Sequence, residues 1–498
     1  MIESNCRSFN LADKLWLPTS TDYSPSPLNN HDLIIDHSWF TVDKFQSSIE
    51  HNPQILNIDN QLPSNNAIRA IKLQLNPSKE VRQHYIVAFN IARWVYNQCV
   101  NWLHISKEKP TKQLLSQLFI GKESKKEDEL QQKYNGLRTQ PQSLQDTVDS
   151  VPYCVKFGAI TDFVDAYYIQ CQMVKEKKRK NFEMHFRSKK RSFQESIYIP
   201  HRDINHRNNV YYCFPRSWGH DSLNVFGDIS LMENIKRDCR MLMTKPGNFY
   251  LVIPRTVECQ PQQLTDHLKV ASLDPGERVF QTVYDSHGQA YNIGKKDDKV
   301  FTLLKIAQRM RDGIKRTWVG GQKIINENRK PKYVGGERIF EKTKSKKTRK
   351  RLRKCAARIE EKIRNMITDI HRKTCKFLCT KYDVIILPKF ESQQMIEKKD
   401  EEGNWKRKIG PETSQNLLRW SHYKFREMLK NKAEVMGRKV IVVTEEWTSK
   451  TCGNCFNIKE DLGGNKEYEC KKCGKEYDRD IHAARNIMML NWKKAGLK

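Results

Sequence analysis

Two pairs of cysteines near the C-terminal end constrain the fold of this chain more than any other feature. Cys452 and Cys455 form the motif CGNC, and Cys470 and Cys473 form CKKC, with fourteen residues between the two pairs. Each pair can place two thiolates on one tight turn, and two such turns supply the four sulfurs of a tetrahedral zinc site. A redox role is the alternative, but lone redox CxxC motifs do not come paired at this spacing. The sequence therefore predicts a structural zinc ribbon over residues 448–477.

The charge of the chain indicates a polyanionic partner. Its 498 residues contain 89 Lys and Arg against 58 Asp and Glu, which gives a formal net charge of +31. Residues 1–66 are an exception, because they contain eight acidic and three basic side chains and are rich in Asn, Ser, Asp and Pro. We expect this acidic segment to be a mostly disordered extension. Nucleic acid is the default partner for the basic remainder, since each neutralised phosphate releases counterions, although a ribosomal or chromatin-like role would share this charge.

The sequence has no feature of a membrane or secreted protein. It contains no run of about 18 apolar residues, and its N-terminus lacks a basic stretch followed by an apolar one. Ten of the 14 cysteines are scattered along the chain, as expected for reduced thiols rather than for a disulfide framework. We therefore expect an intracellular protein without a membrane partner.

The N-terminal half alternates between strand-like and helical segments. Residues 67–77 and 181–258 contain short strand-like runs, and residues 78–180 between them have helical periodicity. Strands on both sides of a helical insert predict a small β-barrel interrupted by a helical lobe. An α+β domain without a nucleic-acid role is the alternative. The aromatic and basic side chains interleaved in FEMHFRSKKRSF favour contact with RNA or DNA.

From residue 259 onwards the order of elements predicts an α/β domain. Three consecutive strands are followed by a helix, a long basic helix over 348–381, a buried strand at 383–390, another helix, a strand at 439–445, and a final helix after the cysteines. This order matches a ribonuclease-H-like sheet. In such a sheet the strand that carries Asp274 is central, and strands 383–390 and 439–445 lie parallel beside it. The expected fold class is therefore a multidomain protein that combines α+β and α/β domains.

Two aspartates are expected to meet at one edge of this sheet. Asp274 ends the first strand before Pro-Gly, and Asp480 precedes the last helix. A turn aspartate and a helix N-cap are the plainer interpretations of these two residues when each is taken alone. Their place in the predicted sheet favours a shared site, because catalytic groups gather at the C-terminal ends of parallel strands.

A third carboxylate is missing where strand 383–390 ends in Pro388. The neighbouring strand ends in Glu445, and a Glu can span much of the distance of about 5 Å between adjacent strands. Glu445 is therefore the preferred third residue, and Glu391, beyond the proline, is the second choice. Glu446 ranks third because it points to the opposite side of an extended strand. Three such carboxylates can hold one or two Mg²⁺ ions, about 4 Å apart when there are two, for attack of a water on phosphorus.

These motifs together resemble the Fanzor proteins, the eukaryotic and viral relatives of the transposon-encoded nuclease TnpB, which is itself similar to type V CRISPR effectors. The resemblance is carried by SLDPG (272–276), TSKTCGNC (448–455), CKKCGKEYDRD (470–480) and AARNI (483–487), and it extends over about residues 67–493. It implies an RNA-guided DNA endonuclease, in which a wedge-like barrel and a helical recognition lobe precede a RuvC nuclease domain that contains the zinc ribbon.

The resemblance also implies partners and residue roles. The cofactors would be a guide RNA encoded at the protein's own locus, Mg²⁺ and Zn²⁺, and the substrate would be double-stranded DNA beside a short adjacent motif. Asp274 and Asp480 correspond to the first and last catalytic aspartates. Bacterial relatives place the middle glutamate where this chain has Pro388, whereas members with a rearranged site place it ahead of TSKTC, as Glu445 is placed here. His482 stands where bacterial members commonly have asparagine.

Two other functions share the same features. One is a nuclease-inactive or domesticated nucleic-acid-binding protein, and the other is a DNA transposase that uses the same fold and metals. The resemblance favours a monomeric ribonucleoprotein that acts in the nucleus of a eukaryotic host or in a virus-infected cell.

Overall fold

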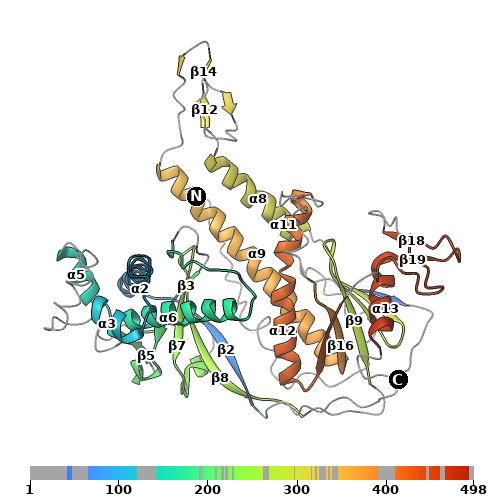
Figure 1. Ribbon diagram of the computed structural model, residues 1–498, viewed down its shortest axis with the longest axis horizontal. Helices are drawn as coiled ribbons and strands as arrows, with labels where there is room; N and C mark the ends of the chain where they lie inside the picture. The colour runs from blue at the N-terminus through green and yellow to red at the C-terminus, as the bar shows by residue number, and fades with distance from the viewer. Residues whose placement is uncertain are drawn as a thin grey trace, which may run out of the picture. The chain divides into compact units, whose positions relative to one another are not determined.

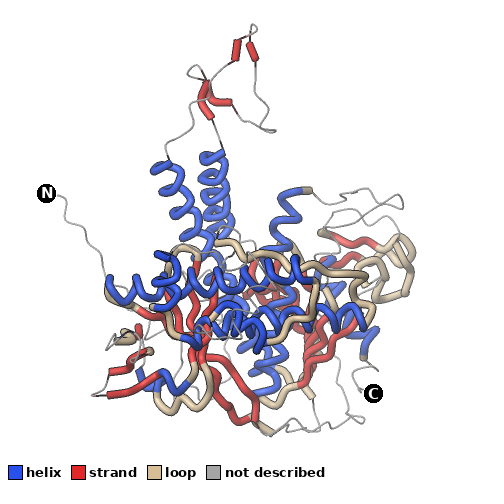
Figure 2. The backbone as a smooth tube through the Cα atoms, turned by 60° about the vertical axis from the view of Figure 1, so that its left-hand side comes forward, coloured by secondary structure: helices blue, strands red, loops and turns tan. Residues whose placement is uncertain are grey.

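The computed structural model describes residues 42–46, 66–120, 142–261, 268–390, 410–444, 448–459 and 466–492, with short gaps inside the third and fourth ranges. The chain divides into two units, Met1–Thr19 with Ile68–Thr256 and Ser20–Ala67 with Val257–Lys498. Helices and strands occur in both units, so the protein has the mixed α/β character that the sequence predicts (Figure 1, Figure 2). Among the described residues, none of the helices combines the length and the apolar character needed to span a membrane.

A five-stranded sheet organises the first unit, in the order β3-β7-β8-β2-β6. Its strands are β2 (Asn66–Leu75), β3 (Gln194–Ile199), β6 (Val225–Phe226), β7 (Cys239–Thr244) and β8 (Phe249–Glu258). A short hairpin, β4 (Ile204–Arg207) and β5 (Val210–Cys213), stands apart from this sheet. Strand β2 precedes the helical insert and the other strands follow it, so segments on both sides of the insert share one sheet. Closure of the sheet into a barrel stays a prediction.

In the described part of the chain, the helical insert contains the helices α2 (Lys79–Ser106), α3 (Lys112–Phe119), α5 (Gln142–Asp149) and α6 (Tyr153–Lys175). Of these, α2 and α6 contact strand β3 of this sheet. Ser78 and Thr111 accept hydrogen bonds from the amides of Val81 and Leu114, so each caps the helix that follows it. Helix α2 buries side chains three or four positions apart, which is the spacing of one helical face.

A six-stranded sheet organises the second unit, in the order β1-β11-β10-β9-β16-β17. Its strands are β1 (Val42–Gln46), β9 (Val270–Pro275), β10 (Val279–Asp285), β11 (Gln289–Lys295), β16 (Val384–Pro388) and β17 (Lys439–Val443). Strand β16 pairs in parallel with both β9 and β17, as predicted, and β9, β10 and β11 are antiparallel neighbours. Strand β1 was not predicted. It lies within the acidic extension and pairs antiparallel with β11.

Helices cover both faces of this six-stranded sheet. They are α9 (Lys346–Lys381), α11 (Pro411–Trp420), α12 (His422–Val435) and α13 (Arg479–Asn491). Helix α8 (Asp298–Lys315) packs against α9 instead. Ala271 and Leu273 of β9 share a core with residues of α9, α11 and α12 on one face, whereas Val270 shares a core with residues of α13 on the other. Figure 1 shows α12 and α13 on opposite sides of β9 and β16. All five residues of β16 are buried, which explains its uninterrupted apolar sequence.

Small hairpins complete the second unit. They are β12 (Thr317–Val319) with β13 (Gln322–Ile324), β14 (Tyr333–Val334) with β15 (Glu337–Arg338), and β18 (Glu467–Glu469) with β19 (Glu476–Asp478). The last of these hairpins leads directly into α13.

Candidate functional site

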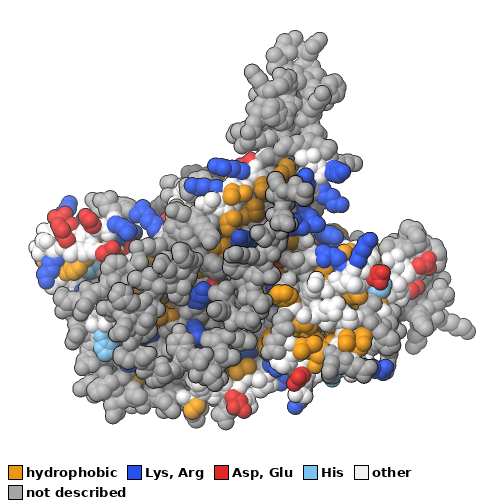
Figure 3. Space-filling model, turned by 180° about the vertical axis from the view of Figure 1, so that it is seen from behind, with side chains coloured by type: hydrophobic (Ala, Val, Ile, Leu, Met, Phe, Trp, Pro, Cys, Tyr) orange, Lys and Arg blue, Asp and Glu red, His pale blue; other side chains and the backbone are white. Residues whose placement is uncertain are grey.

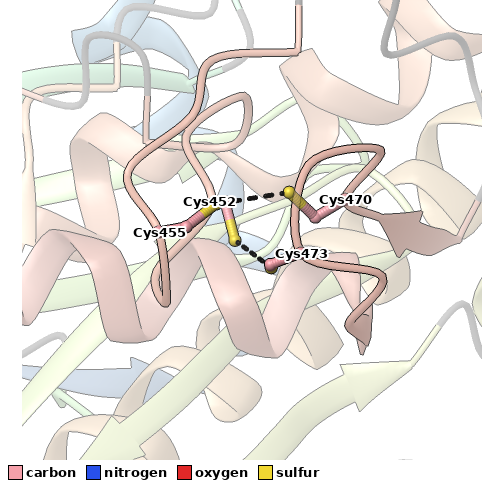
Figure 4. Close-up of side chains that lie close together, drawn as sticks. All are labelled: Cys452, Cys455, Cys470 and Cys473. Carbon is pink, nitrogen blue, oxygen red and sulfur yellow. Dashed lines mark hydrogen bonds between the residues drawn. The ribbon is translucent and has the colours of Figure 1, made fainter.

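The four cysteines predicted to bind zinc come together in the structure (Figure 4). Their sulfur atoms all lie within 4.8 Å of one another. Cys452 Sγ lies 3.7 Å from Cys473 Sγ, and Cys455 Sγ lies 3.5 Å from Cys470 Sγ. Four sulfurs bound at about 2.3 Å from a tetrahedral zinc ion lie about 3.8 Å apart. The cluster therefore fits one zinc ion.

The two cysteine turns are built alike. The amide of Phe456 donates to the carbonyl of Cys452 at 2.9 Å, and the amide of Gly474 donates to the carbonyl of Cys470 at 2.8 Å. Such turns direct backbone N–H groups at the sulfurs, and the N–H of Cys473 lowers the pKa of the Cys470 thiol to about 6. A lowered pKa favours the thiolate, which is the form that binds a metal.

Helix α13 holds the first cysteine turn in place. Asn486 Nδ2 donates to the carbonyls of Thr448 and Thr451 at 2.8 and 2.7 Å, and Arg485 Nη1 donates to the carbonyl of Gly453 at 3.1 Å. A Cβ atom at Gly453 would lie 2.5 Å from Arg485 Nη1 and 2.6 Å from Asn486 Oδ1. A side chain at position 453 would displace Arg485 and Asn486, so glycine allows both of them to bond to the turn.

His482 adds a third contact between α13 and the ribbon. Its Nε2 lies 3.1 Å from the amide of Gly453 and 2.9 Å from the carbonyl of Thr451. The ring stacks against Tyr468 and Tyr477 at centroid distances of 4.9 and 4.4 Å. Burial lowers the pKa of His482, so the ring is neutral at physiological pH. The sequence alone indicates no role for His482. In the structure its ring packs against the ribbon and supports the first cysteine turn.

Asp480 lies in the first turn of α13 without being its cap. The carboxylate of Asp478 accepts hydrogen bonds from the amides of Asp480 and Ile481 at 3.0 and 3.1 Å, so Asp478 is the N-cap. The interpretation of Asp480 as a simple helix cap is therefore wrong. Its half-buried carboxylate has a raised pKa because of burial and the nearby charge of Asp478, against the opposing effect of Arg278.

Helix α13, which carries Asp480, packs against β9, the strand that carries Asp274. Ser272 Oγ donates to the carbonyl of Ala484 at 2.7 Å, which fixes α13 against β9. Asp274 follows Ser272 by two positions and therefore shares its face of the strand, whereas Asp480 precedes Ala484 by about one helical turn. Arg278, just beyond the end of β9, lies close enough to lower the pKa of Asp480. The end of β9 is thus the end at which α13 begins.

The predicted third carboxylate stays a prediction. Glu391, Glu445 and Glu446 lie outside the described residues. The two strand ends that precede them lie side by side, since Pro388 pairs with Val443. Within the described ranges, the four cysteines form the group of three or more side chains that could hold a metal ion.

The turn after Asp274 is held by contacts that the sequence did not indicate. Asn416 Nδ2 donates to Glu277 Oε1 at 2.5 Å, and Trp420 Nε1 donates to the carbonyl of Glu277 at 2.9 Å. Behind this turn, burial lowers the pKa of His422 to about 3, so that this core histidine is neutral. Residues from α11 and α12 therefore hold the backbone turn that follows Asp274 in position.

Comparison with known proteins shows what the chain is similar to. Residues 422–487 match the family model described as Cas12f1-like, TNB domain. A putative transposase of Paramecium bursaria Chlorella virus 1 is 25% identical over 437 residues, which cover 87% of this chain and 89% of that protein. A TnpB-like protein of Acanthamoeba polyphaga mimivirus is 32% identical over 231 residues, 45% of this chain. The chain is TnpB-like.

The likeness is uneven along the TnpB-like chain. The match covers only 37% of the mimivirus protein's own length. The CRISPR-associated endodeoxyribonuclease Cas12f1 of Sulfoacidibacillus thermotolerans is 38% identical over 81 residues, which are 16% of this chain and 19% of that protein.

Two neighbouring aspartates of the TnpB-like chain should respond oppositely to substitution. Because the folded-state pKa of Asp480 is raised, its ionised form destabilises the fold at neutral pH, and this cost disappears as the pH falls below that pKa. We expect Asp480→Asn to raise the melting temperature at pH 7 without added Mg²⁺. Asp478→Ala should instead lower stability by about 1 kcal/mol through loss of the cap. Thermal melts of both variants at pH 7 test this, and a lower melting temperature for Asp480→Asn would contradict it.

Proposed function

We propose that the chain is an RNA-guided, Mg²⁺-dependent DNA endonuclease of the RuvC type, which hydrolyses double-stranded DNA at a single site beside a short adjacent motif. The observation that supports this proposal best is the hydrogen bond between Ser272 and Ala484, which fixes α13 against β9. Asp274 and Asp480, about two hundred positions apart in the sequence, would then meet at one edge of the sheet. Two relatives, the endodeoxyribonuclease Cas12f1 and a putative RNA-guided DNA endonuclease of Streptomyces pristinaespiralis, support the same reaction class.

The donor set fits a hard divalent cation. Carboxylate oxygens are the ligands that Mg²⁺ prefers, and a cation beside Asp480 would offset both its burial and the repulsion from Asp478. Asp274, Asp480 and Glu445 would hold the ion or ions. The metal would activate a water for attack on phosphorus and stabilise the leaving 3′ oxygen.

Val443 supports Glu445 as the third ligand. Val443 is the last residue of β17, and it shares a core with Ala484 of α13. Were the chain to continue as an extended strand beyond Val443, the residue two positions later, Glu445, would face the same side.

Substitution of the three glutamates tests this assignment. We expect Glu445→Gln to reduce cleavage by more than about 100-fold, since even outer-shell changes at metal sites cost 10–100-fold. Glu446→Gln, the adjacent control, should cleave normally. If Glu391→Gln abolishes cleavage and Glu445→Gln does not, the ligand is Glu391.

A stripe of cations in the second unit supports nucleic acid as the partner. Arg364, Thr368 and Arg372 are spaced four apart on α9, and Lys424 Nζ of α12 donates to Thr368 Oγ1 at 3.1 Å. Burial, then the charges of Arg372 and Arg364, lower the pKa of Lys424. Binding of nucleic-acid phosphates would reduce the electrostatic repulsion among Arg364, Arg372 and Lys424. Lys and Arg side chains also gather beside α8 and α9, which run side by side (Figure 1, Figure 3).

We propose the same organisation that the sequence predicts. Residues 67–77 and 181–258 would form a wedge-like barrel, residues 78–180 a recognition lobe, and residues 259–498 the nuclease domain with its ribbon. The protein would act as a monomeric ribonucleoprotein in the nucleus of a eukaryotic host or in a virus-infected cell. The viral relatives favour a virus-infected cell.

Sequencing of the nucleic acid that co-purifies with the protein tests the proposed function. A guided nuclease should carry one discrete RNA transcribed from its own locus. A transposase, the activity named for the Chlorella virus relative, should bind terminal DNA repeats and carry no such RNA. Co-purification of heterogeneous RNA alone would favour a nucleic-acid-binding protein without guided cleavage.

A further inference from the structure

A row of three polar residues crosses the six-stranded sheet at Asp274. In the antiparallel pairing of β9, β10 and β11, Thr282 lies opposite both Asp274 and Asn292. Directly opposite residues of antiparallel strands point to the same face of the sheet, with Cβ atoms about 5 Å apart. Asp274, Thr282 and Asn292 therefore form one continuous row over three strands.

This polar row lies on the face of the sheet that α13 covers. Tyr284 and Ala290 lie two positions from Thr282 and Asn292, and both belong to the core that contains Ala484 of α13. Residues two positions apart on a strand share a face. Thr282 and Asn292 are both buried. The two polar side chains are therefore buried beside Asp274 on the face of the proposed metal site.

The two buried members of the row are hydrogen-bonded to each other. Thr282 Oγ1 donates to Asn292 Oδ1 at 2.9 Å. A hydroxyl has a single proton, so Thr282 can only accept a hydrogen bond from any further neighbour. The ionised carboxylate of Asp274 also only accepts. Two adjacent acceptors suit a hydrated cation, because Mg²⁺ usually keeps several waters, and these waters are hydrogen-bond donors.

We infer that Thr282 and Asn292 are positioning residues for the divalent cation of the proposed metal site at Asp274, on which this inference rests. Asn292 fixes the rotation of the Thr282 hydroxyl, whose lone pairs then accept a hydrogen bond from a water of the cation's hydration shell. Folding alone does not require the pair, because apolar groups of the same shape in place of both hydrogen-bonding partners can be nearly neutral for stability.

Binding of Mn²⁺ to the full-length, zinc-loaded protein tests the inference, measured by isothermal titration calorimetry without nucleic acid. Thr282→Val removes the hydroxyl and nearly keeps the shape of the side chain, whereas Thr282→Ser keeps the hydroxyl. Asn292→Leu removes the acceptor of the Thr282 proton. Asp274→Ala reports the Mn²⁺ that binds elsewhere on the chain. Thr374→Val is the matched control, because Thr374 is a buried threonine of α9 that donates to the carbonyl of Ile370 at 2.8 Å.

We expect Thr282→Val and Asn292→Leu each to bind Mn²⁺ about tenfold more weakly, since outer-shell changes at metal sites cost about 10–100-fold. The double variant should bind no more weakly than Thr282→Val, because the two residues act as one unit. Thr282→Ser and Thr374→Val should bind within about twofold of the parent.

Two further measurements separate positioning of the cation from a role in folding. Half-maximal cleavage by Thr282→Val should need about tenfold more Mg²⁺ than cleavage by the parent protein. The melting temperature of Thr282→Val without divalent cations should fall no further than that of Thr374→Val, because each variant loses one buried hydroxyl.

Two results would overturn the inference while leaving the proposed function intact. One is a Mn²⁺ affinity of Thr282→Val equal to that of the parent. The other is weaker binding by Thr282→Val that Thr282→Ser does not restore, together with a melting temperature well below that of Thr374→Val. If Asp274→Ala binds as much Mn²⁺ as the parent, the proposed metal site fails and the inference fails with it.

Discussion

Asp274→Ala should reduce Mg²⁺-dependent cleavage of double-stranded DNA by at least about 1,000-fold while leaving RNA binding unchanged. The expected loss is large because two-metal hydrolysis depends on carboxylates that hold the ions in place. Asp274 is half-buried at the end of β9, where Ser272 fixes that strand against α13. Linearisation of a target plasmid by the reconstituted ribonucleoprotein measures cleavage, and fluorescence anisotropy of labelled guide RNA measures binding.

Asp478→Asn is the matched control for this experiment. Asp478 is an aspartate beside the proposed site, and asparagine is also a favourable N-cap, so α13 should keep its position. We expect this variant to cleave at nearly the normal rate. Normal cleavage by Asp274→Ala, or equal loss in Asp478→Asn, would contradict the assignment of Asp274.

Cys455→Ser should remove the bound zinc and unfold the C-terminal part of the second unit. Structural zinc binding in small peptides contributes an apparent value of about 10–16 kcal/mol, which is as large as the whole stability of a typical domain. Because His482, Arg485 and Asn486 tie α13 to the first cysteine turn, loss of the turn should also displace Asp480. Zinc content by mass spectrometry, together with limited proteolysis, measures the two effects.

Cys355→Ser controls for the general effect of losing a thiol. Cys355 is a half-buried cysteine on α9, outside the metal cluster. This variant should keep one zinc per chain and a wild-type proteolysis pattern. A zinc content near one for Cys455→Ser, or full protease resistance without zinc, would rule out a structural metal at the cluster.

The parts that the sequence predicted correctly are those with strong local patterns. The spacing of the four cysteines was sufficient to predict that their sulfurs meet. Uninterrupted apolar residues predicted the parallel strand β16, because a strand buried on both faces has no polar alternation. Its pairing with β9 and β17 followed from the order of the elements.

Other features depend on contacts that no local pattern indicates. Strand β1 lies in a polar segment, and its pairing with β11 is long-range. The choice of Asp478 over Asp480 as the helix cap is set by the extended backbone of Asp478, the last residue of β19. The hydrogen bond from Asn416 to Glu277 joins residues 139 positions apart, so the support of the Asp274 turn was invisible in the sequence.

The central claim is that Asp274 and Asp480 bind the same divalent cation. Anomalous scattering from Mn²⁺, which accepts the same oxygen ligands as Mg²⁺, locates such an ion directly in crystals of the protein. We predict an anomalous peak about 2.1 Å from a carboxylate oxygen of each aspartate. A structure saturated with Mn²⁺ in which the two carboxylates bind no common ion would contradict the claim.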